Sequence, residues 1–117
     1  GVPVIAFPKG ARLSGLTALV DAGATAVGLD WTADRAEVKA KLVDRCAFQG
    51  NLDPLRLIAG GAALEHEIKN ILSDFKGSRH IFNLGHGISQ FTPPDHVAAL
   101  VEAVHRHSRT LRATTAG

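Results

Sequence analysis

The chain has 117 residues, of which 45% are hydrophobic and 21% are charged. This composition is typical of a globular protein of about one domain, and it excludes disordered and collagen-like chains. The net charge is only +2 and the 13 lysines and arginines form no run, which argues against a nucleic-acid partner. The first residue is Gly rather than Met, which predicts a trimmed or partial chain.

Cysteine content and the length of the apolar runs bear on the compartment. Cys46 is the only cysteine, so it can form no internal disulfide and no zinc site by itself. Such a chain fits a reducing compartment. The longest apolar runs, such as residues 2–7, are far shorter than the roughly 20 residues that span a bilayer. We therefore expect no membrane partner.

In chain order, four short β-like runs alternate with four helix-like segments. The runs are residues 3–7, 26–31, 47–52 and 80–84. Between them, apolar residues recur every three or four positions, as on one face of a helix. In the first and third helical segments these residues are Leu13, Leu16, Leu19, Val20, Leu64, Ile68, Ile71, Leu72 and Phe75. A last helix is predicted from about Pro93 towards Leu111.

Glycine, proline and short polar residues indicate the helix boundaries. Gly23 and Gly77 stand where helices should end, in positions suited to a left-handed backbone. Asp53-Pro54 predicts an N-cap followed by a proline in the first turn, and Thr92-Pro-Pro-Asp95 predicts a capping box. The Gly60-Gly61 pair predicts a turn that divides the third helical segment into two pieces.

Strand–helix alternation predicts an α/β fold with parallel strands joined by right-handed crossovers. Two architectures remain open, a small doubly wound sheet and half of a (β/α)8 barrel. A complete barrel needs roughly 250 residues, so four β/α units in a chain of this length match half of one. A half barrel would leave two edge strands unpaired and an apolar inner face uncovered.

In either architecture, ligands bind at the carboxyl ends of the strands. This rule selects a small set of candidates before any motif is considered. They are Lys9, Arg12, Asp30, Trp31, Asn51, Asp53, Gly85, His86 and Gly87.

His86 is the most specific of these candidates for a ligand-binding role. Gly85 and Gly87 on either side permit positive φ and a close approach of the backbone to a ligand. Its imidazole can donate to a carboxylate or exchange protons near neutral pH. The plainer interpretation is a histidine that satisfies backbone groups in a tight turn. Amides of residues 50–51 and 85–87 also suit an anion, whether carboxylate or phosphate.

The other polar residues at the strand ends have competing structural interpretations. Asp53 is better explained as the N-cap before Pro54 than as an acid or base. Asp30 can accept hydrogen bonds from neighbouring strands, and Thr32 behind it is a plausible N-cap. Trp31 is expected to pack rather than stack on a ligand, and Lys9 is expected to be a solvated loop residue.

The six histidines do not form a metal-binding pattern. His80 and His86 share strand parity but would lie roughly 20 Å apart in an extended chain. His105 and His107 are two positions apart on a predicted helix and point in different directions. No HExxH, Walker, GxSxG or GxGxxG motif is present. No metal site is therefore expected.

Three motifs in series resemble a known family. They are Val-Gly-Leu-Asp-Trp-Thr at 27–32, Gln-Gly-Asn-Leu-Asp-Pro at 49–54 and Phe-Asn-Leu-Gly-His-Gly-Ile at 82–88, followed by Thr-Pro-Pro at 92–94. In this order and spacing they resemble the C-terminal half of uroporphyrinogen decarboxylase. The opening residues 3–10 and the final helix are similar as well, so the resemblance covers nearly the whole chain.

The resemblance implies a TIM (β/α)8 barrel, of which residues 1–117 carry about strands five to eight as part of a single domain. It implies a cytoplasmic homodimer that needs no cofactor. The implied activity is that of a carboxy-lyase of haem biosynthesis, which removes four acetate carboxyl groups from uroporphyrinogen III to form coproporphyrinogen III. The family's catalytic Asp and carboxylate-binding arginines lie in its N-terminal half, so we expect no catalytic residue here and no activity from this segment alone.

His86 matches the histidine of the family's Asn-Leu-Gly-His-Gly motif, which the resemblance makes a substrate contact. We expect Gly85, Gly87, Asp30 and Asn51 to support that loop. The chain departs from the family pattern just beyond it, at residues 90–91. Two other classes stay open: a related methyltransferase barrel acting on corrinoid or thiol carriers, and a non-catalytic half-barrel interaction module. Cys46 lies at the start of its strand, at the wrong end for a metal-binding methyltransferase site.

Overall fold

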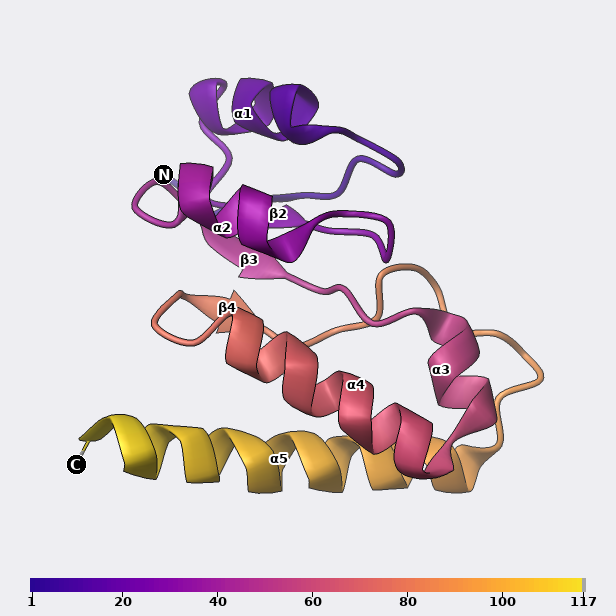
Figure 1. Ribbon diagram of the computed structural model, residues 1–117. Coiled ribbons are helices and arrows are strands. Elements are labelled where there is room, and N and C mark those ends of the chain that lie inside the picture. Colours follow the sequence, from indigo (N-terminus) through magenta and orange to yellow (C-terminus); the bar gives the residue numbers. More distant parts are fainter. Residues whose placement is uncertain (117) are drawn as a thin grey trace.

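The computed structural model describes the backbone of residues 1–116 and the side chains of residues 1–113, and it has the predicted α/β alternation (Figure 1). The strands are β1 (Ile5–Ala6), β2 (Ala26–Gly28), β3 (Ala47–Gln49) and β4 (His80–Ile81). The helices are α1 (Leu13–Asp21), α2 (Arg35–Leu42), α3 (Pro54–Ala59), α4 (Gly61–Asp74) and α5 (Pro94–Ala116).

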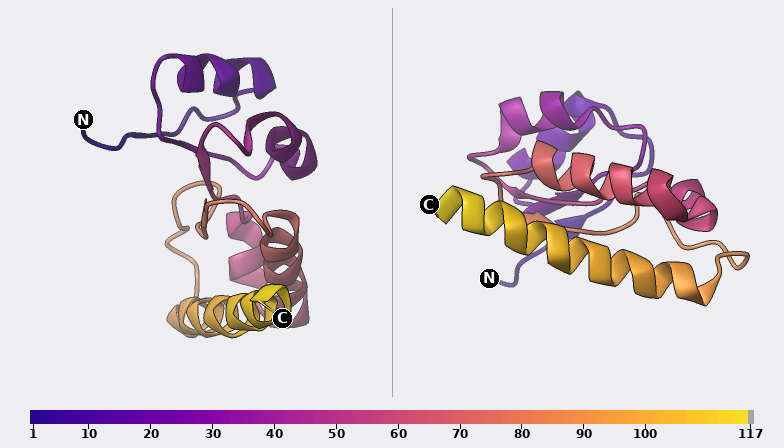
Figure 2. Two further views of the ribbon diagram at one scale, coloured as in Figure 1. Left: turned by 90° about the vertical axis from the view of Figure 1, so that its left-hand side faces the viewer. Right: turned by 60° about the horizontal axis from the view of Figure 1, so that its bottom comes forward.

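The four strands form one parallel sheet in the order β1-β2-β3-β4. A doubly wound sheet needs a point where the strand order reverses, and the described strands contain none. Helices α1, α2 and α4 lie on the same side of the sheet (Figures 1 and 2). This arrangement follows from successive right-handed crossovers that all advance in one direction.

The strands are shorter than the apolar runs that predicted them, because the chain bends into polar loops near each carboxyl end. Backbone pairing nevertheless continues past the strands. The amide of Leu29 donates to the carbonyl of Gln49 at 2.7 Å, and Leu52 pairs with Leu84 as an isolated bridge. The amide of Gly85 then donates to the carbonyl of Leu52 at 2.7 Å. The loops that follow the strands are therefore tied to one another.

The hydrophobic core lies between the sheet and the helices on its covered side. Val27 and Phe48 are paired in register and fully buried, and Phe48 stacks on Phe75 with ring centroids 5.4 Å apart. On the opposite face, Ile5 and Ile81 are 47% and 48% exposed. The sheet thus buries one apolar face and leaves the other open.

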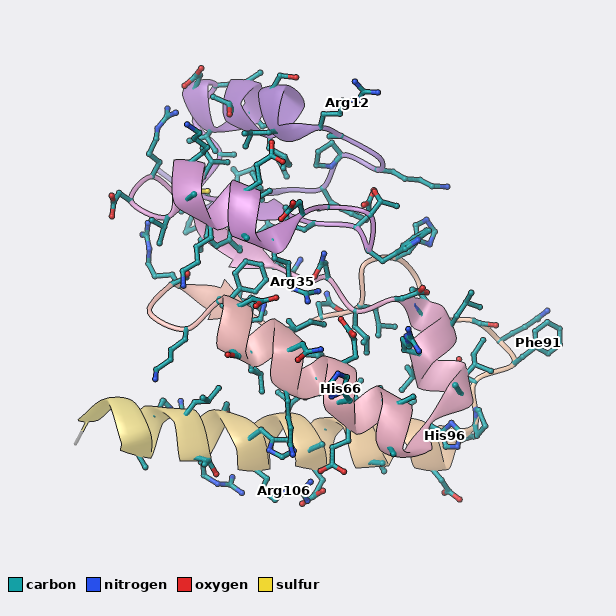
Figure 3. All side chains as sticks on the ribbon, in the orientation of Figure 1. Arg12, Arg35, His66, Phe91, His96 and Arg106 are labelled. Atoms are coloured by element: carbon teal, nitrogen blue, oxygen red, sulfur yellow. The ribbon has the colours of Figure 1, made fainter. Side chains whose placement is uncertain are left out.

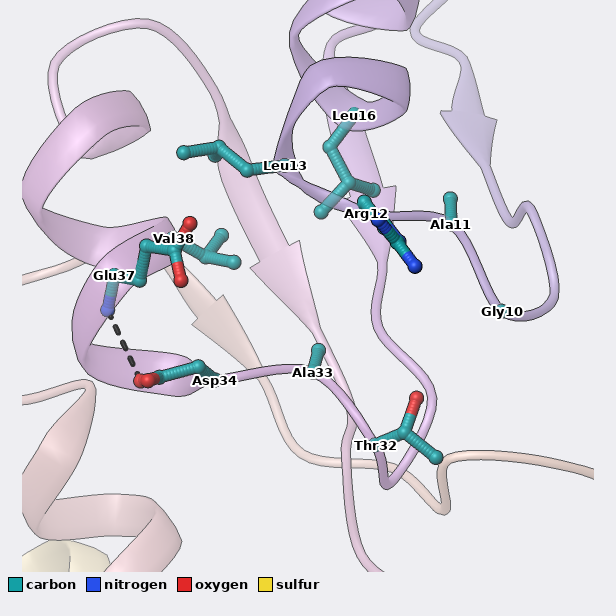
Figure 4. Close-up of a pocket in the computed structure, with 10 residues that line it drawn as sticks. All are labelled: Gly10, Ala11, Arg12, Leu13, Leu16, Thr32, Ala33, Asp34, Glu37 and Val38. Carbon is teal, nitrogen blue, oxygen red and sulfur yellow. Dashed lines mark hydrogen bonds between the residues drawn. The ribbon is translucent and has the colours of Figure 1, made fainter.

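Two helix starts show which polar side chain caps them. Asp53 accepts a hydrogen bond from the amide of Leu55 at 2.9 Å, which confirms its role as the N-cap of α3. At the start of α2, the cap is Asp34, whose Oδ1 accepts from the amide of Glu37 at 3.2 Å (Figure 4). The prediction that Thr32 is the cap was wrong, because α2 begins three residues later, at Arg35, and the Thr32 hydroxyl instead donates to Asp30.

The other predicted boundaries are partly confirmed. Gly23 and Gly77 have φ of 110° and 83°, as expected near helix ends. The capping box at residues 92–95 was wrong: α5 begins at Pro94, and the Thr92 hydroxyl is buried without a hydrogen-bond partner in the described part of the chain. Pro94 therefore stands at the first position of the helix, where a missing amide hydrogen costs nothing, and Pro93 occupies the cap position expected for Thr92.

Ion pairs join α4 to α5 on the outer surface. Glu65 accepts hydrogen bonds from Arg106 and from Nε2 of His107, the latter at 3.0 Å. The hydrogen bond from His107 outweighs partial desolvation and, with the charge of Arg106, lowers the pKa of Glu65. These half-exposed contacts add to the apolar packing of Leu100, Ala103 and Val104 on the core. Helix α5 runs alongside α4 (Figure 3).

The turn predicted at Gly60-Gly61 separates α3 from α4, and it accommodates a side chain of α5. Gly60 and Gly61 have φ of 65° and 63°. A Cβ on Gly60 would lie 2.6 Å from the imidazole of His96, whereas a Cβ on Gly61 would meet nothing within 4 Å. Nδ1 of His96 also bonds to the carbonyl of Leu57 at 2.8 Å. Gly60 therefore leaves the space that His96 needs.

Gly60→Ala is expected to lower the free energy of unfolding by about 2 kcal/mol, and Gly61→Ala by about 1 kcal/mol. Both substitutions strain a positive-φ position, but only the first displaces His96. Urea unfolding of both variants measures the difference. In a His96→Ala background the two losses should converge, and equal losses in the presence of His96 would contradict this account.

Candidate functional site

The residues after the four strands meet at one edge of the sheet, as the parallel topology requires. Asp30 and Trp31 follow β2, Asn51 follows β3, and Gly85 and His86 follow β4. Asp30 and Asn51 are buried, with 5% and 2% exposure, while His86 and Trp31 are exposed. The edge therefore has a buried polar layer beneath an accessible aromatic one.

The Asp30 carboxylate forms the centre of the buried layer. Its Oδ2 accepts from the amide of Gly10, in the loop after β1, and its Oδ1 accepts from the amide of Thr32 at 2.9 Å and from the Thr32 hydroxyl. Burial alone would raise the pKa of Asp30, but the Thr32 and Gly10 hydrogen bonds together lower it below the usual 3.8. Asp30 is thus an ionised group whose hydrogen bonds join the loop after β1 to the loop after β2.

Asn51 connects the loop after β3 to the loop after β2. Its Nδ2 donates to the carbonyls of Asp30 at 2.9 Å and Ala33 at 3.3 Å. Its Oδ1 accepts from Nη1 of Arg35 at 3.2 Å. Both ends of the buried amide are therefore used, which satisfies the polar groups that burial would otherwise penalise.

Arg35 is a residue of this edge that sequence reasoning missed. It lies between α2 and α4 (Figure 3), where its Nε also donates to Asp74 at 2.7 Å and its Nη1 reaches Glu67 at 3.4 Å. Its planar guanidinium can serve several acceptors at once. The only local signal was its position at the first turn of a helix that follows a candidate strand end.

Gly85 lies directly on the peptide between Asp30 and Trp31. A Cβ at this position would be 2.5 Å from the backbone nitrogen of Trp31, so only glycine fits. Neither Gly85 nor Gly87 uses the positive φ that glycine permits. Close approach, rather than left-handed backbone, explains Gly85, and a Cβ on Gly87 would meet nothing within 4 Å.

His86 lines two adjoining hollows. The inner hollow, of about 390 Å³, lies over the open face of the sheet, where Phe7 and Ile88 supply apolar surface and Gln49 and Asn83 supply amides. The outer hollow, of about 240 Å³, lies beside Trp31 and Asp53.

In the described part of the chain the imidazole of His86 has no hydrogen-bond partner, and its only ring contact is with Trp31. Both of its nitrogens are therefore available to a ligand.

The sequence model of the family described as uroporphyrinogen decarboxylase (URO-D) matches residues 1–107. This chain belongs to the uroporphyrinogen decarboxylase family. A uroporphyrinogen decarboxylase from Cupriavidus necator is 52% identical over 116 residues, which cover 96% of this chain and 32% of the relative. Another, from Burkholderia thailandensis, is 50% identical over 115 residues, covering 97% of this chain and 31% of the relative. The chain thus spans about a third of the length of these curated relatives.

In this member of the uroporphyrinogen decarboxylase family, the candidate cations Arg12 and Lys9 do not line the hollows at His86. Arg12 precedes α1 and lines a separate hollow of about 410 Å³ between the first turns of α1 and α2, together with Asp34 and Glu37 (Figure 4). Lys9 is exposed in the loop after β1 and lines neither of the two hollows at His86. Asp53 does border the outer hollow, while its carboxylate caps α3.

Among the described residues, no group of three or more His, Cys, Asp or Glu side chains is arranged to hold a metal ion. His80 points to the helix side of the sheet, where it stacks on Phe75 with centroids 4.4 Å apart. Burial lowers the pKa of His80, although a hydrogen bond with the carbonyl of Gly50 at 2.7 Å opposes this effect.

No helix within residues 1–116 has the length and apolarity needed to cross a membrane.

Proposed function

We propose that this chain is part of an enzyme that decarboxylates the four acetate side chains of uroporphyrinogen III to give coproporphyrinogen III. The observation that carries the proposal is the exposed imidazole of His86, which has both nitrogens available at the carboxyl edge of the sheet. Membership of the uroporphyrinogen decarboxylase family supports the choice of substrate. The chain would contribute part of the substrate pocket rather than the group that drives the chemistry.

The inner hollow suits such a substrate on chemical grounds. A tetrapyrrole presents a broad apolar ring system with carboxylate arms at its periphery. The hollow pairs Phe7 and Ile88 with the polar groups of Gln49, Asn83 and His86. In the proposed complex, a ring N–H of His86 donates to a substrate carboxylate. If the imidazole is protonated, this becomes a charge-assisted hydrogen bond, which is stronger than a neutral one.

His86 would act by holding the substrate while the reaction proceeds elsewhere in the complete site. In each decarboxylation the bond between the acetate methylene carbon and its carboxyl carbon breaks and carbon dioxide leaves. The bonding electrons pass into a protonated pyrrole, the methylene carbon then gains a proton to become a methyl group, and the pyrrole gives up the proton that it had taken on. A fixed carboxylate on another arm keeps the reacting arm in position, which is a contribution from orientation.

We further propose that residues 1–117 belong to a single barrel domain, as its C-terminal part. The sequential strand order and the helices on one face of the sheet support a barrel. The exposed Ile5 and Ile81 on the other face support an inner surface that further strands cover. By family resemblance, the complete protein is proposed to be a cytoplasmic homodimer, with uroporphyrinogen as its substrate and no cofactor.

The methyltransferase alternative is less well supported by the position of Cys46. The residue precedes β3, at the opposite end of the strand from Asn51 and the His86 edge. It is fully buried, and burial raises the pKa of its thiol despite the positive charges of Arg79 and Arg45. A protonated thiol inside the core is poorly suited to metal binding. The interaction-module alternative leaves the available His86 without a role.

His86→Ala in the complete protein is expected to raise the KM for uroporphyrinogen about 10- to 100-fold. This range corresponds to the loss of one hydrogen bond between charged partners. The melting temperature should stay within about 2 °C of the parent value, because an exposed side chain contributes little to stability. Steady-state kinetics and differential scanning calorimetry measure the two quantities.

His66→Ala provides a matched control, because His66 is an exposed histidine on α4, away from the strand ends (Figure 3). We expect it to leave both KM and melting temperature unchanged. An unchanged kcat/KM in His86→Ala, together with a lowered melting temperature, would instead show that His86 has a structural role in its turn.

A further inference from the structure

We propose that Trp31 is a positioning residue for His86, holding its imidazole in the orientation from which it binds substrate. The rings meet edge to face, with centroids 6.0 Å apart and an interplanar angle of 82°. Trp31 was expected to be a packing residue, yet its side chain is 42% exposed and lies outside the hydrophobic core. The inference rests on the proposed substrate contact of His86, but the ring contact itself does not depend on it.

The backbones that carry the two rings are fixed relative to each other. Trp31 directly follows Asp30, whose carboxylate is bonded to Gly10 and Thr32 and whose carbonyl accepts from Asn51. His86 directly follows Gly85, which lies against the backbone nitrogen of Trp31. The buried hydrogen bonds therefore place both Cα atoms, and only the side-chain torsions of His86 remain to be set.

Trp31 is the group available to set those torsions. In the described residues the imidazole has no hydrogen bond that would orient it, and glycines on both sides offer no side chain to pack against it. An edge-to-face pair between aromatic rings contributes about 0.5 to 1.5 kcal/mol beyond the area it buries. This is enough to favour one rotamer of an exposed side chain over its alternatives.

The position of the pair explains why orientation matters. His86 is shared by the inner and outer hollows, whereas Trp31 borders only the outer one. An imidazole free to rotate would divide its time between the two hollows. Contact with Trp31 on the outer side restricts it to one arrangement at the boundary, so less rotamer freedom is lost when a carboxylate binds.

The test uses the complete protein with Trp31→Ala, Trp31→Phe, His86→Ala and the double variant Trp31→Ala/His86→Ala. We expect Trp31→Ala to raise the KM for uroporphyrinogen about three- to tenfold with little change in kcat, and Trp31→Phe to restore most of that loss. The double variant should bind no worse than His86→Ala alone, because Trp31 acts through His86. Fully additive losses would overturn the proposal.

A second measurement reads the contact directly in the substrate-free protein. The ring C–H resonances of His86, identified by their disappearance in His86→Ala, should carry a ring-current shift from the indole. Trp31→Ala should remove this shift, and Trp31→Phe should retain part of it. Phe91→Ala is the matched control, because Phe91 is an aromatic residue of the same loop with 76% exposure and no ring contact with His86 (Figure 3).

The two measurements separate failure of this inference from failure of the proposed function. If His86→Ala leaves the KM unchanged, the proposed substrate contact is wrong, and the ring-current shift alone decides whether Trp31 orients His86. If Trp31→Ala leaves the His86 resonances where they are, the positioning role is overturned whatever the kinetics show. Trp31→Phe guards against a general folding defect, since it keeps an aromatic ring at the position.

Discussion

Asp30→Ala is expected to lower the free energy of unfolding of the complete protein by about 3 kcal/mol, measured by urea unfolding. The substitution removes a buried carboxylate and leaves the Gly10 amide and the Thr32 amide and hydroxyl without their acceptor. Hydrogen bonds to a charged group are worth about 1.5 to 3 kcal/mol each, and solvent will replace part of the loss because Gly10 and Thr32 are exposed. The loops that carry Trp31 and His86 should loosen as a result.

The same carboxylate should leave a signature in the pH dependence of stability. Because the pKa of Asp30 is lower in the folded protein than its usual 3.8, the ionised form stabilises the fold above that value. This contribution is lost as the pH falls through the folded pKa. Between about pH 5 and pH 2, Asp30→Asn should therefore lose less stability than the parent protein.

Asp53→Ala is the matched control, because Asp53 also follows a strand but accepts one amide hydrogen bond as a helix cap. Its loss is expected to cost about 1 kcal/mol. If Asp30→Ala costs no more than Asp53→Ala, Asp30 is not the centre of the buried hydrogen-bond network described above.

A polypeptide limited to these 117 residues is expected to form no measurable coproporphyrinogen from uroporphyrinogen. His86 supplies one contact for a substrate with several carboxylates. The sheet keeps two open edges, at β1 and β4, and an uncovered face that exposes Ile5 and Ile81. Chromatographic separation of the oxidised porphyrins detects the product, and the complete protein at equal concentration is the positive control.

Size-exclusion chromatography of the same polypeptide tests the reason for inactivity. Exposed strand edges and apolar surface favour association, so we expect aggregation or pairing rather than a monomer. Measurable conversion of uroporphyrinogen would contradict the expected inactivity. A stable monomer without activity would favour the non-catalytic interaction module.

Local patterns predicted the elements of the fold better than they predicted its contacts. Apolar runs located the strands, and apolar periodicity located α1, α4 and α5. The Asp53 cap and the Gly60 turn were confirmed because they depend on neighbours in the sequence. The strand lengths were overestimated, since an apolar run does not show where pairing ends. Thr32 was misassigned as a cap because α2 begins only at Arg35, where Asp34 caps it, and the Thr32 hydroxyl donates to Asp30 instead.

In the candidate site, too, the sequence predicted which residues follow the strands but not the contacts between distant segments. The parallel topology and the strand-end rule brought Asp30, Asn51 and His86 to one edge from sequence alone. Arg35 was missed because its acceptors Asn51, Glu67 and Asp74 lie 16 to 39 positions away along the chain. No periodicity or motif at Arg35 itself identifies such distant partners.

The sequence by itself determined the α/β class, the order of the elements and the placement of His86 after the last strand, because these follow from residues close together in the chain. Only the tertiary structure decided that position 85 must be glycine, because its backbone approaches that of Trp31. Only the tertiary structure showed that, among the described residues, the His86 imidazole contacts the Trp31 ring and forms no hydrogen bond. It also showed one face of the sheet uncovered. Such features arise from distant segments brought into contact, where side-chain packing and backbone approach, rather than local propensity, set the energy.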